Sequence, residues 1–231
     1  IDDPSFSRGV IDFIKVCNVV KTFRNTRILQ IGPRPFDFWS VIVNEGELLE
    51  KFGIQLSPIP LGELTSYMNG LIEKNDSRIE ETKETFRKWA DIQIKDEDFT
   101  KVAALKLAMQ DKMKEYGCNC GTIQCWTELQ RKIGILPYAS EALLQTEGMP
   151  VTCEVDINGA ISEVLAEAAT LGDERALFAD VNCRHPENEN GELLQHLGTF
   201  AFQTAKNRPV LPQSHFVFDY PGSAAFEVKD G

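Results

Sequence analysis

The chain has 231 residues, of which 42% are hydrophobic, and this is enough for one large or two small domains with a buried core. Its formal net charge of −11 argues against nucleic-acid binding, because phosphate recognition needs a basic surface. The sequence shows no signal peptide and no run of roughly 18 apolar residues that would predict a transmembrane helix. We therefore expect a cytoplasmic protein that binds neither nucleic acid nor a membrane.

The first residues of the chain alternate between helical and strand patterns. Because two strands separated by one helix favour a parallel crossover, this region predicts a βαβ unit in a parallel sheet. The turn Gly32-Pro33-Arg34-Pro35 is not a nucleotide loop, since two prolines remove amide donors that a phosphate would need. The expected elements are a helix over Ser7–Phe23, a strand over Arg27–Gly32, a helix over Phe36–Phe52 that ends at Gly53, and a strand over Ile54–Pro60.

Three further helices are predicted before residue 117. Leu61–Ile72 is one, Asn75–Trp89 is charged and reads as a solvated helix, and Asp96–Tyr116 is strongly periodic. An apolar stripe on the last of these is expected to pack on the sheet, and Gly117 to end it. The stripe consists of Val102, Leu105, Met109, Met113 and Tyr116.

The stretch from Met149 to Asp180 predicts a strand, a helix and a second strand. Apolar residues alternate over 151–155, Asn158 is a good helix N-cap, and the helical pattern ends before Gly172. A second apolar run covers Ala176–Val181, so the stretch has the length of a parallel crossover. It follows two short helices predicted over Leu129–Ile135 and Glu141–Glu147.

Acidic residues stand late in both of these predicted strands. Glu154 and Asp156 lie in the first and Asp180 in the second. Ligands bind beyond the carboxyl ends of strands in open α/β sheets, and carboxylate oxygens suit Mn²⁺ or Mg²⁺. These acids are therefore candidates for a divalent metal site, with an exposed acidic strand face as the alternative.

Two segments carry a resemblance to a known family. Residues 153–160 (CEVDINGA) followed by residues 177–181 (LFADV) resemble the metal-binding core of the L-fucose isomerase/L-arabinose isomerase superfamily, most closely its fucose isomerase branch. The resemblance implies that Glu154 and Asp180 are metal ligands, that the metal is Mn²⁺, and that both acids are catalytic. The implied reaction is aldose–ketose isomerisation of an open-chain sugar through an ene-diol. Asp156 would orient the site from behind the metal ligands or, equally, be a structural turn-forming residue.

Two more residues enter through the same resemblance. Gln124 precedes a Trp-Thr pair, which implies contact with substrate hydroxyls, although a polar residue that caps a nearby element reads equally well. His196 lies 16 residues after Asp180 and is expected to line the substrate site, with metal binding as the alternative. His185 and His215 lie in loop contexts and are expected at the surface.

The C-terminal part changes composition from Pro209 onward. The alternation Phe216-Val217-Phe218 and the final stretch Gly222–Gly231 resemble the start of the family's β-rich C-terminal domain. We therefore expect an α/β fold with a Rossmann-like parallel sheet flanked by helices over residues 1–150. Residues 151–231 would hold the metal-site βαβ unit and the truncated beginning of the β-rich domain.

The ends of the sequence predict a fragment of a longer protein, with a domain before Ile1 and more of the β-rich domain after Gly231. The third metal ligand, a late His of the family, would then lie outside this chain, and the fragment would be inactive alone. The full-length protein is expected to bind a small-molecule sugar and to form a homo-oligomer. A non-catalytic sugar- or metal-binding protein that kept the isomerase fold is the alternative.

The six cysteines fit no secreted disulfide framework. Cys118, Cys120 and Cys125 suggest zinc at first sight, but no second ligand pair with zinc spacing accompanies them. Reduced and mostly buried thiols in a reducing compartment are expected instead.

Overall fold

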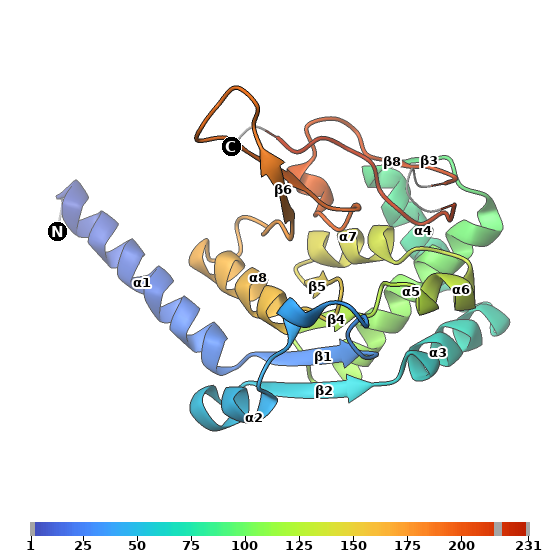
Figure 1. The fold of residues 1–231 in the computed structure, drawn as a ribbon, viewed down its shortest axis with the longest axis horizontal. Helices are drawn as coiled ribbons and strands as arrows, with labels where there is room; N and C mark the ends of the chain where they lie inside the picture. The colour runs from blue at the N-terminus through green and yellow to red at the C-terminus, as the bar shows by residue number, and fades with distance from the viewer. Residues whose placement is uncertain (1–2, 215–218, 230–231) are drawn as a thin grey trace.

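A four-stranded parallel sheet forms the centre of the protein, whose computed structural model describes residues 3–214 and 219–229. The strand order is β2-β1-β4-β5, and each neighbouring pair is parallel (Figure 1). Helices cover both faces, so the predicted α/β class with a Rossmann-like sheet is confirmed. The strands are β1 (Arg27–Ile31), β2 (Gln55–Ile59), β4 (Cys120–Ile123) and β5 (Val151–Thr152).

Alternation along β1 divides the core into two apolar clusters. Leu29 and Ile31 belong to one cluster, and Ile28 faces the opposite layer, because successive strand residues point to opposite faces. The first cluster is covered by α3 (Leu61–Glu73), α4 (Arg78–Trp89), α5 (Asp96–Glu115), α6 (Glu128–Ile133) and α7 (Tyr138–Thr146). The second is covered by α1 (Pro4–Arg24), η2 (Leu48–Phe52) and α8 (Ile157–Ala169).

The stripe on α5 packs as predicted. Val102, Leu105, Met109 and Met113 are all fully buried, whereas Tyr116 lies at the end of the stripe and is 39% exposed. Gly117 follows with a φ of +65°, a conformation that favours glycine and that ends the helix.

The reading of α4 as a solvated helix is wrong for one of its faces. Ile79 and Phe86 are buried against the rest of the helical layer. Lys83 is only 2% exposed, and its ammonium lies 3.0 Å from Glu80 and 2.9 Å from Asp96. The many charged residues of α4 predicted full exposure. A lysine can nevertheless bury its aliphatic stem while its ammonium forms ion pairs, as Lys83 does.

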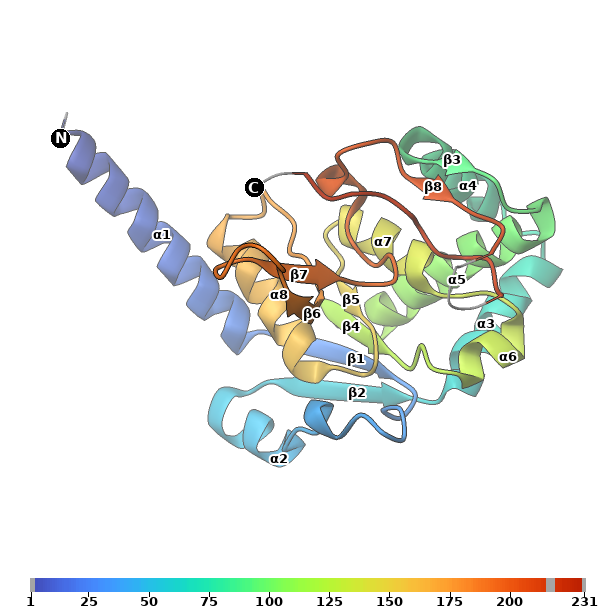
Figure 2. The same ribbon diagram turned by 45° about the horizontal axis from the view of Figure 1, so that its top comes forward.

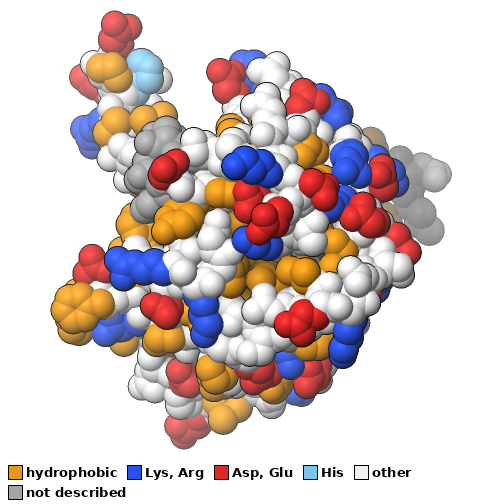
Figure 3. Space-filling model, turned by 90° about the vertical axis from the view of Figure 1, so that its right-hand side faces the viewer, with side chains coloured by type: hydrophobic (Ala, Val, Ile, Leu, Met, Phe, Trp, Pro, Cys, Tyr) orange, Lys and Arg blue, Asp and Glu red, His pale blue; other side chains and the backbone are white. Residues whose placement is uncertain are grey.

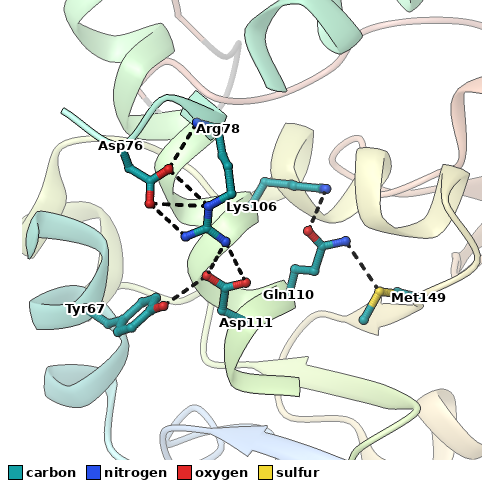
Figure 4. A network of polar contacts seen from close by, with 7 residues as sticks. All are labelled: Tyr67, Asp76, Arg78, Lys106, Gln110, Asp111 and Met149. Atoms are coloured by element: carbon teal, nitrogen blue, oxygen red, sulfur yellow. Dashed lines mark hydrogen bonds and ion pairs between the residues drawn. The ribbon is translucent and has the colours of Figure 1, made fainter. Parts of the chain in front are cut away.

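A polar network holds α3, α4 and α5 together. Arg78 binds both carboxylate oxygens of Asp111 at 2.9 and 3.1 Å, and it also pairs with Asp76 at 2.8 Å (Figure 4). The hydroxyl of Tyr67 donates to the same Asp111 carboxylate at 3.0 Å. The helical layer behind the sheet is thus fixed by ion pairs as well as by apolar packing. On the side where α3 and α6 lie, Lys and Arg side chains stand interspersed with Asp and Glu (Figure 3).

The predicted helix over Phe36–Phe52 is only partly formed. A 3₁₀ turn, η1, covers Trp39–Val41, and continuous helical structure begins at α2 (Glu45–Glu47) and runs through η2. The side chain of Asn44 accepts from the amide of Glu47 and so sets the start of the helix there. The predicted end is confirmed, since Gly53 closes the helix with a φ of +74°.

The second strand of the predicted metal-site crossover does not join the parallel sheet. β6 (Asp180–Arg184) instead pairs antiparallel with β7 (Glu192–Gln195) in a separate hairpin. All five residues of β6 are exposed, whereas an inner strand of a parallel sheet is buried on both faces. The predicted strand–helix–strand unit is therefore wrong beyond α8.

The C-terminal residues run back over α4 and α5 as short strands and turns. β8 (Val210–Leu211) pairs parallel with β3 (Asp91–Ile92), and isolated bridges join Ala205 to Val228 and Val210 to Ala225. A 3₁₀ turn, η3, covers Phe202–Thr204. The predicted strand Phe216-Val217-Phe218 and His215 lie outside the described residues. The domain boundary at residue 150 stays a prediction, while β5 pairs with β4 across it.

The structure bears on the predictions about the cysteines and about membrane-spanning helices. All six cysteines are free thiols; Cys17 and Cys183 are exposed and the other four are buried, as predicted. Within residues 3–214 and 219–229, no helix is both long enough and apolar enough to cross a membrane.

Candidate functional site

The carboxyl edge of the parallel sheet carries the candidate site. β1 and β4 are neighbours at the sheet centre, and the chain continues from them to opposite sides, to β2 and to β5. Such a switch in strand order opens a crevice at the carboxyl ends of the two central strands, where ligands of α/β folds bind.

Gln124 lies at this switch point, directly after β4. Its backbone N–H donates to the carbonyl of Ile31 at 2.9 Å, and its side chain packs over Gly32 at the end of β1. Gly32 has a φ of +81°, and a Cβ there would lie 2.8 Å from Oε1 of Gln124. The glycine thus makes room for the amide side chain that the sequence predicted to face the substrate.

Glu154 follows β5 in a tight turn. The strand ends at Thr152, and Glu154 and Val155 take φ values of +66° and +57°. Strand alternation therefore no longer applies at this point, and the prediction that Glu154 and Asp156 lie in the strand is wrong. Left-handed conformations are rare for non-glycine residues and recur at functional sites, where a turn re-aims a side chain.

Asp156 starts α8 and is its N-cap. Its Oδ1 accepts from the amide of Gly159 at 2.9 Å, which satisfies one of the free donors of the first turn. The sequence assigned this cap to Asn158, which instead lies inside the helix. Of the two readings given for Asp156, the structural one describes what its side chain does, and a role at the site stays a prediction.

The electrostatics of Glu154 connect it to Asp180. Burial, followed by the negative charges of Asp180 and Asp156, raises the pKa of Glu154 to about 7. Asp180 begins β6 in the separate hairpin, yet it lies close enough for its charge to act on Glu154. Asp180 thus acts on Glu154 from the β6–β7 hairpin, whereas the sequence predicted a neighbouring parallel strand.

His196 lies at the end of β7 and faces the same region. Burial lowers the pKa of its imidazole, and the charge of Asp180 partly offsets this effect. The ring packs 5.2 Å from that of Phe178 and 6.2 Å from that of Tyr138, centroid to centroid. A partly buried and neutral imidazole beside Asp180 can donate a hydrogen bond to a substrate oxygen or accept one from it.

A buried polar group that the sequence analysis missed lies beneath Glu154. The thiol of Cys153 donates to Oε2 of Glu141 at 3.1 Å, and Glu141 is fully buried on α7. Burial raises the pKa of Glu141 to about 8. Its Oε1 and the Tyr138 hydroxyl have no hydrogen-bond partner within the described residues. The sequence feature that could have identified Glu141 is its position as the one acid in the otherwise uncharged helix Tyr138–Thr146.

The described residues offer two carboxylates for a metal ion. Glu154 and Asp180 are oxygen ligands of the kind that Mn²⁺ prefers, and a cation between them would relieve their mutual repulsion. Over residues 3–214 and 219–229, no three His, Cys, Asp or Glu side chains are grouped as a metal site. A complete coordination shell would need ligands beyond these two.

Sequence comparison places the chain near sugar isomerases. It is 24% identical over 204 residues to the sulfoquinovose isomerases of Priestia aryabhattai and Priestia megaterium, which covers 88% of this chain and 45% of each relative. The sulfoquinovose isomerase of Alkalicoccus urumqiensis is 23% identical over 205 residues, with 89% and 45% covered. The chain therefore spans about half the length of the curated relatives it matches. No protein-family model matches the chain.

Proposed function

We propose that this chain forms part of a metal-dependent aldose–ketose isomerase, with Glu154 as the group that transfers the proton. The observation that carries the proposal is the position and the pKa of Glu154 at the carboxyl edge of the sheet beside Asp180. Glu154 has a pKa of about 7 before a cation binds, and a bound cation would favour its ionised form, which is the form that a general base needs. The relationship to proteins named as sugar isomerases supports the same reaction class.

The proposed chemistry moves one proton between two carbons of an open-chain sugar. Glu154 takes the proton from C2 of the aldose, and solvent water gives a proton to O1, so that an ene-diol forms. The proton then returns from Glu154 to C1 while O2 releases its own proton to solvent water, which leaves the ketose. Gln124 is suited to hold the sugar hydroxyls because its amide both donates and accepts, and His196 would line the opposite side.

A divalent cation, which we propose to be Mn²⁺, would be held by Glu154 and Asp180 together with ligands beyond the described residues. When bound, it would supply Lewis-acid stabilisation of the charge that develops on the sugar oxygens. The negative charge of Asp180 would also favour uptake of the proton by Glu154.

We propose a sugar as the substrate, and the names of the relatives make sulfoquinovose the first sugar to assay. The competing function is a sugar- or metal-binding protein without catalysis. The observation that favours it is the lack of a three-ligand metal group among residues 3–214 and 219–229.

Turnover and binding measurements on the natural full-length protein separate the two functions. Ketose formation is followed with Mn²⁺ present, and sugar binding is measured by calorimetry. The isomerase predicts that Glu154→Gln lowers kcat by about 100-fold or more, an order of magnitude typical of a lost general base. Asp180→Asn should also lower kcat, because it removes a proposed ligand of the cation. The matched control, Glu174→Gln, removes an exposed acid and should leave kcat unchanged. Sugar binding without turnover in any form would establish the non-catalytic alternative.

A further inference from the structure

Several hydrogen bonds hold the backbone of the turn that carries Glu154. The amide of Asp156 donates to the carbonyl of Cys153 at 3.1 Å, and the Thr152 hydroxyl donates to the carbonyl of Asp156 at 3.0 Å. The Thr122 hydroxyl, on β4, donates to the carbonyl of Thr152 at 3.1 Å. These bonds lie within the turn or join it to the sheet, and none of them reaches a helix of the layer behind it.

The side chain directly before Glu154 makes the connection to that helical layer. The thiol of Cys153 donates to Oε2 of Glu141 on α7 at 3.1 Å, and both residues are fully buried. Cys153 also packs with Cys125 and Tyr138 in a small buried cluster. The carboxyl of Glu141 thus holds the chain at the point where β5 ends and the turn begins.

Helix α7 is itself firmly held. It packs against both β5 and α5, and it lies next to β5 in both ribbon views (Figures 1 and 2). All nine of its residues are buried. The hydroxyl of Ser140, next to Glu141, donates to the carbonyl of Val102 on α5 at 2.8 Å. A carboxyl on such a helix can move little, so its hydrogen bond restricts the movement of Cys153.

The conformation of the turn needs this restriction. Glu154 and Val155 have φ values of +66° and +57°, which are unfavourable for residues with a side chain and most of all for the β-branched valine. Strained residues of this kind persist only where the surrounding structure over-determines them. If the thiol of Cys153 lost its partner, the turn would be free to relax and Glu154 would change direction.

The burial of Glu141 is costly, and packing alone does not explain it. A carboxyl removed from water destabilises a fold unless its hydrogen bonds compensate, and Oε1 of Glu141 has no partner among residues 3–214 and 219–229. An apolar side chain of similar size would fill the same space at a lower cost. A residue that lowers stability and contacts the neighbour of a proposed catalytic group is typical of a functional site.

We propose that Glu141 is a positioning residue that aims Glu154 at the substrate by holding the Cys153 thiol, an inference that rests on the role proposed for Glu154. Glu141 is not a catalytic residue in this proposal, because it is fully buried and acts through Cys153. What it contributes is an acceptor oxygen at a fixed place.

Two substitutions of Glu141 separate the acceptor oxygen from the acid. Glu141→Gln keeps an oxygen for the Cys153 thiol, whereas Glu141→Leu removes every acceptor. Both remove the acid, so any effect of the buried acid on stability is common to both. In the natural full-length protein with Mn²⁺ present, Glu141→Leu should lower kcat by about tenfold or more with KM little changed, because the group that transfers the proton is misdirected. Glu141→Gln should keep the wild-type kcat. Equal losses in both variants, or no loss in Glu141→Leu, overturn the proposal.

Amide hydrogen exchange in the 231-residue chain tests the turn without any turnover. The amide of Asp156 should exchange about fivefold faster in Glu141→Leu, which corresponds to the loss of one ordinary hydrogen bond, and at the wild-type rate in Glu141→Gln. The amide of Gly32, which donates to the carbonyl of Ile59 at 2.8 Å, is the reference and should not change. Unchanged exchange of Asp156 in Glu141→Leu overturns the proposal. If the wild type forms no ketose, the proposed reaction fails, and exchange alone decides whether Glu141 holds the turn.

Substitutions of Cys153 test the same hydrogen bond from its other end, even if Glu141→Leu folds poorly. Cys153→Ala removes the donor and should reproduce the loss of kcat and the faster exchange of Asp156, whereas Cys153→Ser keeps a donor and should retain the wild-type values. Cys120→Ala removes another fully buried thiol, on β4, and should leave kcat unchanged. Wild-type kcat and exchange in Cys153→Ala would contradict the positioning role of Glu141.

Discussion

Glu141 and Glu154 differ in burial, and they therefore differ in protonation state at neutral pH. Glu141 is fully enclosed, and burial raises its pKa to about 8, so it carries a proton at neutral pH. Glu154 is only partly buried, and its pKa of about 7 leaves it able to change its protonation state. A protonated acid beneath a titrating one keeps negative charge out of the buried layer.

At the residue scale, Glu141 should make the protein less stable as the pH rises. Between pH 4.5 and about 8 the unfolded chain loses this proton while the folded chain keeps it, so the free energy of unfolding falls across that window. Glu141→Gln should remove this part of the fall, which amounts to about 1.4 kcal/mol for each unit of pKa shift. Denaturant unfolding at several pH values measures it.

The side-chain amide introduced by Glu141→Gln could still accept from the Cys153 thiol, so the variant keeps the hydrogen bond that Glu141 makes. Glu174→Gln, which replaces an exposed acid, serves as the matched control and should unfold with the pH dependence of the wild type. Equal pH dependence in Glu141→Gln and the wild type would mean that Glu141 is not the buried acid described here.

At the element scale, α8 should depend on Asp156 for its start. Asp156→Ala removes the acceptor for the Gly159 amide and should lower the free energy of unfolding by about 1 kcal/mol. Asn158→Ala is the matched control, because Asn158 is exposed inside the helix, where alanine is well tolerated. Thermal denaturation of both variants checks the order, and a larger loss in Asn158→Ala would refute the cap assignment.

Elements with long and strong periodicity could be predicted from the sequence, and elements fixed by tertiary contacts could not. α5 has a stripe that packs in the core, and β1 carries three buried apolar residues, Ile28, Leu29 and Ile31, as strands of parallel sheets do. The run over 176–181 had similar composition, but β6 pairs in an exposed hairpin. Pattern alone does not tell an inner strand from an edge hairpin.

The scale of the whole molecule explains how much of the candidate site the sequence could indicate. The resemblance of residues 153–160 and 177–181 made Glu154 and Asp180 candidate residues, and the charge of Asp180 raises the pKa of Glu154 in the structure. Their roles stay predictions. The route that brings the acids together, a turn after β5 and a separate hairpin, depends on long-range packing. Glu141 was missed because one acid in an otherwise uncharged helix does not show, without the fold, that the helix packs close to Glu154.

The central claim is that burial and the charge of Asp180 raise the pKa of Glu154 at the carboxyl edge of the sheet. It is tested most directly by a carbon-13 NMR titration of the Glu154 side-chain carboxyl in the 231-residue chain without added metal. The account predicts a midpoint near pH 7 that moves down in Asp180→Asn and stays in place in Glu174→Gln. A midpoint near the ordinary 4.5, or one that does not respond to Asp180→Asn, would contradict it.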